Sequence, residues 1–350
     1  MMAQVPKRVL IVDDSATLRR IIRARLARDP RLVVVGEASD AFEARAQIKA
    51  LKPDVLTLDV EMPRMSGLDF LERLMRLHPL PVIMISTETQ KGSAAALEAL
   101  SLGAVDCVGK PSNGDLISAF EELADLLVAA ADAHIHNGRG ISHLTPSTDF
   151  TWNGRYVLIG SSTGGVTALE HILKSYPENC PPTLIAQHMP ESFLASFARR
   201  LNGKIGPTIQ VAQDGQPLQQ GNIYVAPGGE HHLAISTGDT LRCRLIDGAK
   251  VSGHRPSVDV LFKSAVPVAQ DTCAFILTGM GRDGAAGMGV LRKAGARCFA
   301  QDAESSVVFG MPRVALEEGA AEAALALSDI PKVILDLCGA SGSRRMMGSR

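Results

Sequence analysis

Aromatic residues, cysteine pairs, long apolar runs and excess charge are all scarce in this sequence of 350 residues. Only 4% of the residues are aromatic, and the six cysteines are scattered without a C-x-x-C pair, so we expect reduced thiols rather than a zinc site or a disulfide frame. No apolar run is as long as a membrane span, and the first residues lack the apolar core of a signal peptide. The net charge of -1 gives no electrostatic reason to bind nucleic acid. These absences predict a cytoplasmic globular protein without direct membrane insertion.

The length and the patterning of the chain predict two domains. A chain of 350 residues is long enough for two hydrophobic cores. One α/β pattern occupies residues 1–130 and a second occupies residues 154–338. Between them, residues 131–153 are rich in His, Gly, Ser, Thr and Pro without an apolar face, which predicts a flexible linker. The polar tail, residues 339–350, is expected to be disordered.

The first domain alternates five short β-branched runs with five helical patterns. The strands are expected at RVLIVD, LVVVGE, DVLTLD, PVIMIS and AVDCVG. This alternation predicts an α/β fold with a doubly wound, five-stranded parallel sheet. Ligands of such sheets bind at the carboxyl ends of the strands, so the residues at those ends are the candidates for function.

Chemically active side chains stand at those strand ends. Asp13 and Asp14 end the first strand, Asp59 ends the third, Ser86 ends the fourth and Lys110 ends the fifth. Carboxylates brought this close repel each other unless a cation joins them, and an oxygen-rich set suits Mg²⁺. The set predicts a phosphoryl-transfer site with Asp59 as the nucleophile. Single acids after strands often only cap helices, but this alternative does not account for the whole set.

The segments IVDDS, LDVEMPRMSGLDF, MIST and GKP resemble the receiver domains of bacterial response regulators, which have a flavodoxin-like fold. The resemblance covers about residues 7–130. It implies that Asp59 accepts a phosphoryl group from a histidine kinase. Many receivers have an aromatic switch residue three places before the lysine, and this chain has Cys107 there. That departure puts the usual aromatic relay in question, but not phosphorylation.

The same resemblance implies the metal site of the receiver domain. Asp14, Asp59 and the backbone carbonyl of Glu61 would hold Mg²⁺, with Asp13 in support. Phosphorylation would then require Mg²⁺, whose charge, together with that of Lys110, neutralises the phosphoryl oxygens.

In the second domain, residues 160–164 read GSSTG and match G-x-S-x-G, with Ser162 at the centre. They follow the strand YVLIG and precede the helical pattern GVTALEHILKS, which is the context of a nucleophile elbow. The rival interpretation is a glycine-rich phosphate loop. It lacks the middle glycine of G-x-G-x-x-G and the lysine of a P-loop.

A serine nucleophile needs a base and a group that orients the base. His188 follows the next strand, PTLIAQ, and is the first candidate. His231 and His232, at the start of a predicted hairpin strand, and His254, in a loop before a helix, are competitors. Asp283 is the acid in the glycine-rich turn after CAFILT, although it could simply cap the helix that follows. The order serine, histidine, aspartate differs from that of ordinary α/β-hydrolases.

The blocks IGSSTGG, AQHMP, YVAPGG, HRPSVDVLF and LTGMGRDGA together resemble the catalytic domain of the chemotaxis protein-glutamate methylesterases. The resemblance covers about residues 155–337 and implies an α/β serine hydrolase with a mainly parallel sheet. It implies a triad of Ser162, His188 and Asp283, with the Met280 N–H in the oxyanion hole. No cofactor is expected in this domain.

The two resemblances imply an enzyme that phosphorylation activates. It would hydrolyse glutamyl methyl esters on chemotaxis receptors and deamidate receptor glutamines, with the unphosphorylated receiver blocking large substrates. Two other classes of function remain open. A DNA-binding output is disfavoured by the balanced charge and by the absence of a basic helix-turn-helix segment. A non-catalytic scaffold would have no need for a complete set of triad residues.

Overall fold

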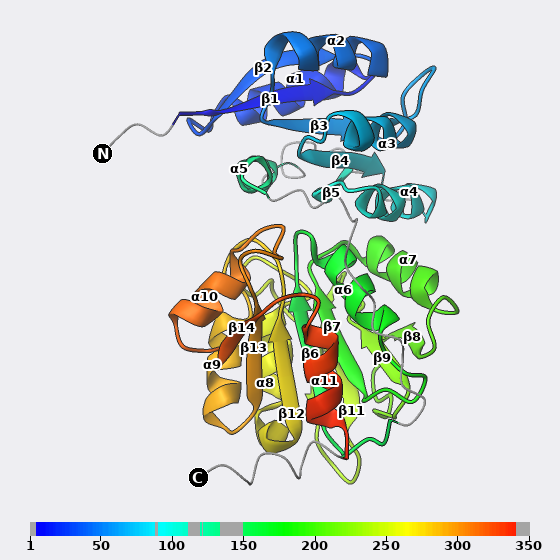
Figure 1. Ribbon diagram of the computed structural model, residues 1–350, viewed down its shortest axis with the longest axis vertical. Helices are drawn as coiled ribbons and strands as arrows, with labels where there is room; N and C mark the ends of the chain where they lie inside the picture. The colour runs from blue at the N-terminus through cyan, green and yellow to red at the C-terminus, as the bar shows by residue number, and fades with distance from the viewer. Residues whose placement is uncertain (1–4, 88–89, 111–119, 121, 134–149, 341–350) are drawn as a thin grey trace. The chain divides into compact units, whose positions relative to one another are not determined.

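The computed structural model divides the chain into two compact units, Met1–Arg139 and Gly140–Arg350 (Figure 1). The structure describes residues 5–87, 90–110, 120, 122–133 and 150–340. Most of the predicted linker and almost all of the predicted disordered tail lie outside these residues, so both stay predictions. Among the residues that the structure describes, every helix is too short or too polar to span a bilayer.

The N-terminal unit is the doubly wound parallel sheet that the sequence predicts, with strand order β2-β1-β3-β4-β5. The strands are β1 (Lys7–Val12), β2 (Leu32–Ala38), β3 (Val55–Asp59), β4 (Val82–Thr87) and β5 (Asp106–Lys110). The helices are α1 (Ala16–Leu26), α2 (Ala41–Leu51), α3 (Gly67–Leu77), α4 (Gln90–Ser101) and α5 (Leu123–Ala131). Because β1 has β2 and β3 as its neighbours, the strand order reverses at β1, and a crevice is expected there.

Side-chain caps begin the first three helices of this unit. The Ser15 hydroxyl accepts a hydrogen bond from the Leu18 N–H, the Asp40 carboxylate caps α2, and the Ser66 hydroxyl caps α3. Each cap pairs backbone N–H groups that have no partner within the helix. The caps therefore fix where the chain turns from each strand end into the helix that follows, which is where the candidate residues lie.

The C-terminal unit is built on a seven-stranded parallel sheet with strand order β14-β13-β12-β6-β7-β9-β8. This confirms the expected mainly parallel sheet. Its strands are β6 (Tyr156–Ser161), β7 (Thr183–Gln187), β8 (Thr208–Val211), β9 (Asn222–Val225), β12 (Thr272–Ile276), β13 (Arg297–Gln301) and β14 (Ala323–Leu325). A separate antiparallel hairpin consists of β10 (His231–Ser236) and β11 (Arg242–Asp247).

Six α-helices and one 3₁₀ helix, η2, are described in this unit. They are α6 (Gly165–Lys174), α7 (Glu191–Leu201), α8 (Val258–Ser264), η2 (Val266–Asp271), α9 (Ala285–Lys293), α10 (Met311–Glu317) and α11 (Ile330–Cys338). Strands β12, β6 and β7 are neighbours at the centre of the sheet. Their carboxyl ends therefore meet, and these ends precede the candidate aspartate, serine and histidine.

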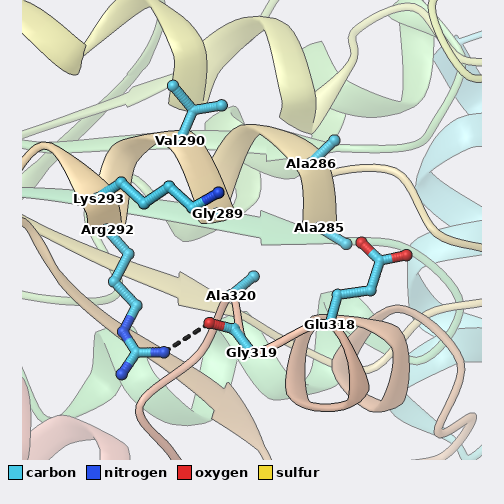
Figure 2. Close-up of a pocket in the computed structure, with 9 residues that line it drawn as sticks. All are labelled: Ala285, Ala286, Gly289, Val290, Arg292, Lys293, Glu318, Gly319 and Ala320. Carbon is cyan, nitrogen blue, oxygen red and sulfur yellow. Dashed lines mark hydrogen bonds between the residues drawn. The ribbon is translucent and has the colours of Figure 1, made fainter.

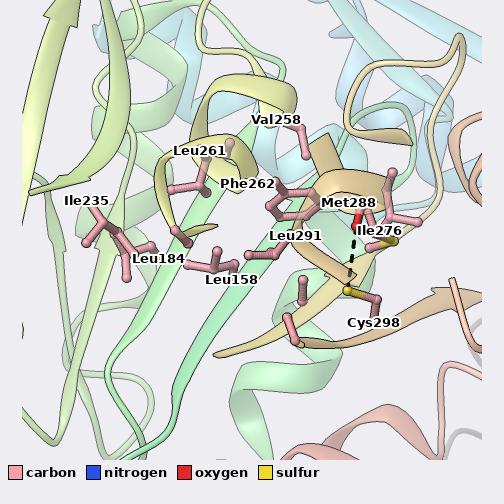
Figure 3. Packing of buried hydrophobic residues seen from close by; sticks show 14 of the residues in the cluster. Leu158, Leu184, Ile235, Val258, Leu261, Phe262, Ile276, Met288, Leu291 and Cys298 are labelled. Atoms are coloured by element: carbon pink, nitrogen blue, oxygen red, sulfur yellow. Dashed lines mark hydrogen bonds between the residues drawn. The ribbon is translucent and has the colours of Figure 1, made fainter. Parts of the chain in front are cut away.

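The core of the C-terminal unit joins the centre of the sheet to α8 and α9 (Figure 3). Leu158 of β6 and Leu184 of β7 are fully buried, as are Phe262 of α8 and Met288 and Leu291 of α9. Burial of such side chains is the main stabilising term of a domain. It also holds the first turns of α8 and α9 beside the strand ends.

Candidate functional sites

The acids predicted at the strand ends of the N-terminal unit gather at one point. Asp13, Asp14 and Asp59 each offer a carboxylate oxygen, and these oxygens lie within 4.8 Å of one another. The Lys110 Nζ lies 2.8 Å from Asp59 Oδ1 and 3.3 Å from Asp13 Oδ2. Asp13 and Asp59 are buried, whereas Asp14 is exposed. Ser86 is buried near the end of β4, the strand between β3 and β5.

The electrostatics of this cluster favour a bound cation. Burial raises the pKa of Asp59 to about 6, and the charge of Asp13 adds to the effect against the hydrogen bond from Lys110. Burial would lower the pKa of Lys110, but its contacts with the two carboxylates outweigh burial and raise it. Asp59 Oδ2 is buried without a hydrogen-bond partner in the described part of the chain. Hard carboxylate oxygens of this kind fit Mg²⁺.

Two further residues of the N-terminal unit bear on this site. The Glu61 N–H donates to Asp59 Oδ1 over 3.3 Å, which places Glu61 beside the cluster. The Cys107 thiol donates to the carbonyl of Ala96 in α4 over 3.4 Å. Burial raises the pKa of this thiol, so it stays protonated at neutral pH. The position that is aromatic in many receivers is thus occupied by a small thiol that contacts α4.

In the C-terminal unit, Ser162 lies on the sharp turn between β6 and α6. Its N–H donates to the carbonyl of Thr278 over 3.1 Å, and its carbonyl accepts from Gln187 Nε2 over 2.9 Å. The turn needs Gly164, whose φ is +77° and where a Cβ atom would lie 2.6 Å from the Cβ of Val307. A positive φ and a close neighbour both exclude a larger residue. This is the strand-turn-helix context expected of a nucleophile elbow.

His188 and Asp283 form a buried pair across the strand ends. The Nε2 of His188 lies 2.8 Å from Asp283 Oδ2, and the two side chains are only 5% and 1% exposed. The Nδ1 of His188 is buried without a hydrogen-bond partner in the described residues. The backbone N–H of His188 donates to the carbonyl of Ser161 over 3.1 Å, which places it beside the elbow. Among the described residues, no hydrogen bond joins the Ser162 hydroxyl to His188.

The Asp283 carboxylate also accepts hydrogen bonds from the start of α8. The donors are the Ser257 hydroxyl at 2.8 Å and the N–H groups of Val258 and Asp259 at 2.7 and 3.2 Å. Burial alone would raise the pKa of Asp283, but its hydrogen bonds, with His188 first among them, lower it. Asp283 is therefore ionised at neutral pH and is held in a fixed orientation against His188.

The alternative that Asp283 caps the helix that follows it is wrong. That helix, α9, has Gly284 at its N-cap without a side-chain cap of its own. Its first N–H groups donate instead to Asp259 Oδ1, from Gly284 over 3.1 Å and from Gly287 over 2.6 Å. Asp283 therefore adds to the cap of α8, whose N-cap residue Ser257 accepts from the Val260 N–H over 3.4 Å, and Asp259 caps α9.

The three other candidate histidines, His231, His232 and His254, have different surroundings. A ring nitrogen of His231 faces an exposed aspartate at the end of β11. His232 is buried, accepts from the Ser257 N–H over 3.1 Å, and supports the segment before α8. His254 lies against His188, with ring centroids 3.7 Å apart and ring planes 9° apart. Of the three competitors, only His254 contacts His188.

The turn after β12 contacts the serine. A Cβ atom at Gly279 would lie 2.7 Å from the Cβ of Ser162, so the glycine permits this approach. The Gly279 carbonyl accepts from the N–H groups of Gly310 and Met311, which anchors the turn. Met280 follows and is half-buried. Within the described residues, its N–H has no acceptor, as an oxyanion-hole donor requires before substrate binds.

Gln187, which no sequence motif singled out, joins the ends of β6 and β7. Its Oε1 accepts from the Ser161 hydroxyl over 2.6 Å. Its Nε2 donates to the carbonyls of Ser162 and His188 over 2.9 and 3.2 Å. The one signal in the sequence is a polar residue at the end of an otherwise apolar strand, directly before the candidate base.

A separate cavity of about 460 Å³ lies between α9 and the segment that follows α10 (Figure 2). Ala285, Gly289 and Val290 line one side, and Glu318 and Gly319 line the other. None of the candidate catalytic residues, all of which the structure describes, lines it. This cavity is therefore not the candidate active site.

The chain matches two known protein families. A family profile described as CheB methylesterase matches residues 157–334. The chain belongs to the CheB methylesterase family. A second profile, described as response regulator receiver domain, matches residues 9–121. Both matches fall on the units that carry the two candidate sites.

Relatives of this CheB-family chain align with it over nearly its whole length. A Caulobacter vibrioides protein named protein-glutamate methylesterase/protein-glutamine glutaminase 1 is 54% identical over 340 residues, which are 95% of this chain and 98% of that protein. A Rhizobium johnstonii protein of the same name is 53% identical over 96% of this chain and 97% of that protein. The crystal structure of the Thermotoga maritima CheB methylesterase catalytic domain is 37% identical and covers 53% of this chain and 99% of that domain, with a TM-score of 0.51.

Proposed function

We propose that this chain is a phosphorylation-activated protein-glutamate methylesterase and protein-glutamine deamidase that acts on methyl-accepting chemotaxis receptors. The carrying observation is the buried pair of His188 and Asp283 beside the nucleophile elbow that carries Ser162. The names of the relatives supply the substrate class. A receiver domain in the same chain supplies the means of control.

The proposed reaction is acyl transfer through Ser162. The Ser162 hydroxyl gives its proton to the free Nδ1 of His188 while its oxygen attacks the γ-carbonyl of the glutamyl ester. Asp283 orients the ring through Nε2 and stabilises the imidazolium. The Met280 N–H helps to hold the oxyanion. His188 then returns the proton to the leaving methoxide, which departs as methanol.

The second half of the reaction uses the same groups. His188 takes a proton from a water molecule, which attacks the acyl-enzyme, and the proton returns to Ser162 as the glutamate side chain leaves. A glutamine substrate follows the same course with ammonia as the leaving group. No step in this scheme calls for a cofactor in the C-terminal unit.

In the N-terminal unit, we propose that Asp59 accepts a phosphoryl group from a histidine kinase. Asp13, Asp14 and Asp59 would hold Mg²⁺ with the carbonyl of Glu61, and this ion would offset negative charge around the phosphoryl group. Lys110, already in contact with Asp59, and Ser86 would contact the phosphoryl oxygens. The kinase and the receptors are the partners that this proposal requires.

The deciding experiment is methanol release from methylated receptor membranes. Wild-type protein should release methanol, and Ser162→Ala should release none above background, because no other group takes the place of the nucleophile. Ser236→Ala, which changes a serine at the end of β10, is the matched control and should keep its activity. Equal release by wild type and Ser162→Ala would overturn the assignment.

A further inference from the structure

We propose that His254 is a positioning residue that sets the ring plane of His188. The two rings lie almost parallel, 9° apart in plane, with centroids 3.7 Å apart. The inference rests on the proposed function, in which His188 is the base. It assigns to His254 a task that neither Asp283 nor the backbone performs.

The backbone of His254 is fixed by a tight turn. Val251 and His254 exchange two hydrogen bonds between their N–H and carbonyl groups, each of 3.0 Å. The two residues between them, Ser252 and Gly253, have φ of 52° and 85°, as a turn of this type needs. The next residue, Arg255, donates its Nε to the carbonyl of Gly229. His254 is thus presented to His188 from a rigid segment.

The ring of His188 needs such a support because, among the described residues, it has a single hydrogen bond. The hydrogen bond from Nε2 to Asp283 fixes one atom of the ring but permits the ring to rock about that contact. Nδ1 has no partner among the described residues that would stop this motion. A flat neighbour at stacking distance restricts the ring to one plane. The stack thereby keeps Nδ1 aimed along one direction, which is what proton transfer requires.

The charge state of His254 is compatible with this task. The titratable groups that face it are His188, Asp283 and Lys250. Burial, together with His188 and Lys250, lowers its pKa to about 4 against the opposing effect of Asp283. His254 is therefore neutral at neutral pH. A neutral ring does not repel the proton that His188 takes up during the reaction.

The test measures kcat and KM for methanol release by the full chain with Mg²⁺ and acetyl phosphate. His254→Ala should lower kcat by about ten- to a hundred-fold, because loss of orientation has effects of this order, and should leave KM within about two-fold. His254→Phe keeps a flat ring and should recover kcat to within about three-fold of wild type. His231→Ala, which removes a histidine whose ring faces Asp247 instead of His188, should behave as wild type.

A second readout does not depend on the receptor. A fluorophosphonate probe labels an activated serine, so its rate of reaction with Ser162 reports on the base directly. His254→Ala should be labelled more slowly than wild type and His254→Phe at nearly the wild-type rate, with unchanged unfolding midpoints. If His254→Ala keeps the wild-type kcat and labelling rate, the inference is wrong while the proposed function stands. If wild type is labelled but releases no methanol, the proposed substrate is wrong, and the labelling rates still decide the role of His254.

Discussion

At the scale of single residues, the Asp283 carboxylate has two partners of different kinds. It accepts from the ring of His188 and from the first turn of α8. A neutral side chain of the same shape would satisfy some of these donors but would present an N–H group to others. Catalysis and helix capping therefore depend on the same negative charge.

We predict that Asp283→Asn lowers kcat by about 10⁴-fold, the order seen when a triad aspartate becomes asparagine, because the wrong tautomer of the base is then favoured. The measurement is methanol release at saturating receptor. Ser257→Ala is the matched control, since it removes one donor to Asp283 and the side-chain N-cap of α8 but leaves the carboxylate in place. It should lose far less of kcat. Comparable losses in the two variants would show that packing, not charge, matters at this position.

The lowered pKa of Asp283 predicts a pH dependence of stability. A carboxyl whose pKa is lower in the folded state contributes stability above its unfolded pKa, and that contribution is lost as pH falls through the folded pKa. Wild type should therefore exceed Asp283→Asn in free energy of unfolding by a constant amount at neutral pH. The difference should shrink below the ordinary value of 3.8. Urea unfolding at stepped pH measures it, and a difference that grows on acidification would contradict the prediction.

At the scale of elements, α8 and α9 exchange caps. Asp283 precedes α9 and caps α8, while Asp259 lies in α8 and caps α9. The first turns of the two helices must pack closely for both caps to form. Gly287 permits this, since a Cβ atom there would lie 2.8 Å from the carbonyl oxygen of Asp259.

We predict that Gly287→Ala destabilises the C-terminal unit and lowers kcat. The added methyl group would push α9 from α8 at a cost of about 1–3 kcal/mol, which outweighs the gain in helix propensity. Gly289→Ala is the matched control in the same helix, because its Cβ atom would lie 3.6 Å from the Cβ of Ala320. It should leave kcat unchanged and gain up to about 1 kcal/mol. Urea unfolding and methanol release together test the pair, and a harmless Gly287→Ala would refute the packing argument.

At the scale of the whole molecule, the acid cluster should control the hydrolase. We predict that Mg²⁺ and acetyl phosphate raise methanol release by wild type but not by Asp59→Asn, which lacks the phosphoryl acceptor. Asp125→Asn, on the exposed side of α5, is the control and should respond as wild type. Chelation of Mg²⁺ should remove the response without affecting the basal rate. An equal response in Asp59→Asn would separate the two sites functionally.

Much of this arrangement could be predicted because a parallel sheet places the carboxyl ends of its strands at one edge. The alternation of strands and helices predicted the sheet of the N-terminal unit, and the family resemblance implied the mainly parallel sheet of the C-terminal unit. The residues at strand ends, from Asp13 to Lys110, indicated where one site would form. The hairpin strand that begins at His231 was also predicted. These features depend on local periodicity, which a sequence displays directly.

The remaining features depend on contacts between distant segments. The sequence left open that Asp283 caps the helix next to it, but its carboxylate accepts from the start of α8, because the position of α8 follows from packing and not from local pattern. The stack of His254 on His188 and the contacts of Gln187 likewise arise only after the strands are placed side by side. Residue types alone do not reveal such pairings.

The exchange of caps has an evolutionary consequence. Asp259 lies in α8 and Asp283 in the turn before α9, yet a substitution at either removes hydrogen bonds from the start of the helix that carries or follows the other. We therefore expect that the substitutions tolerated at one of these two positions depend on which residue occupies the other. We also expect that Asp259, which touches no substrate in the proposed mechanism, is constrained together with the active site.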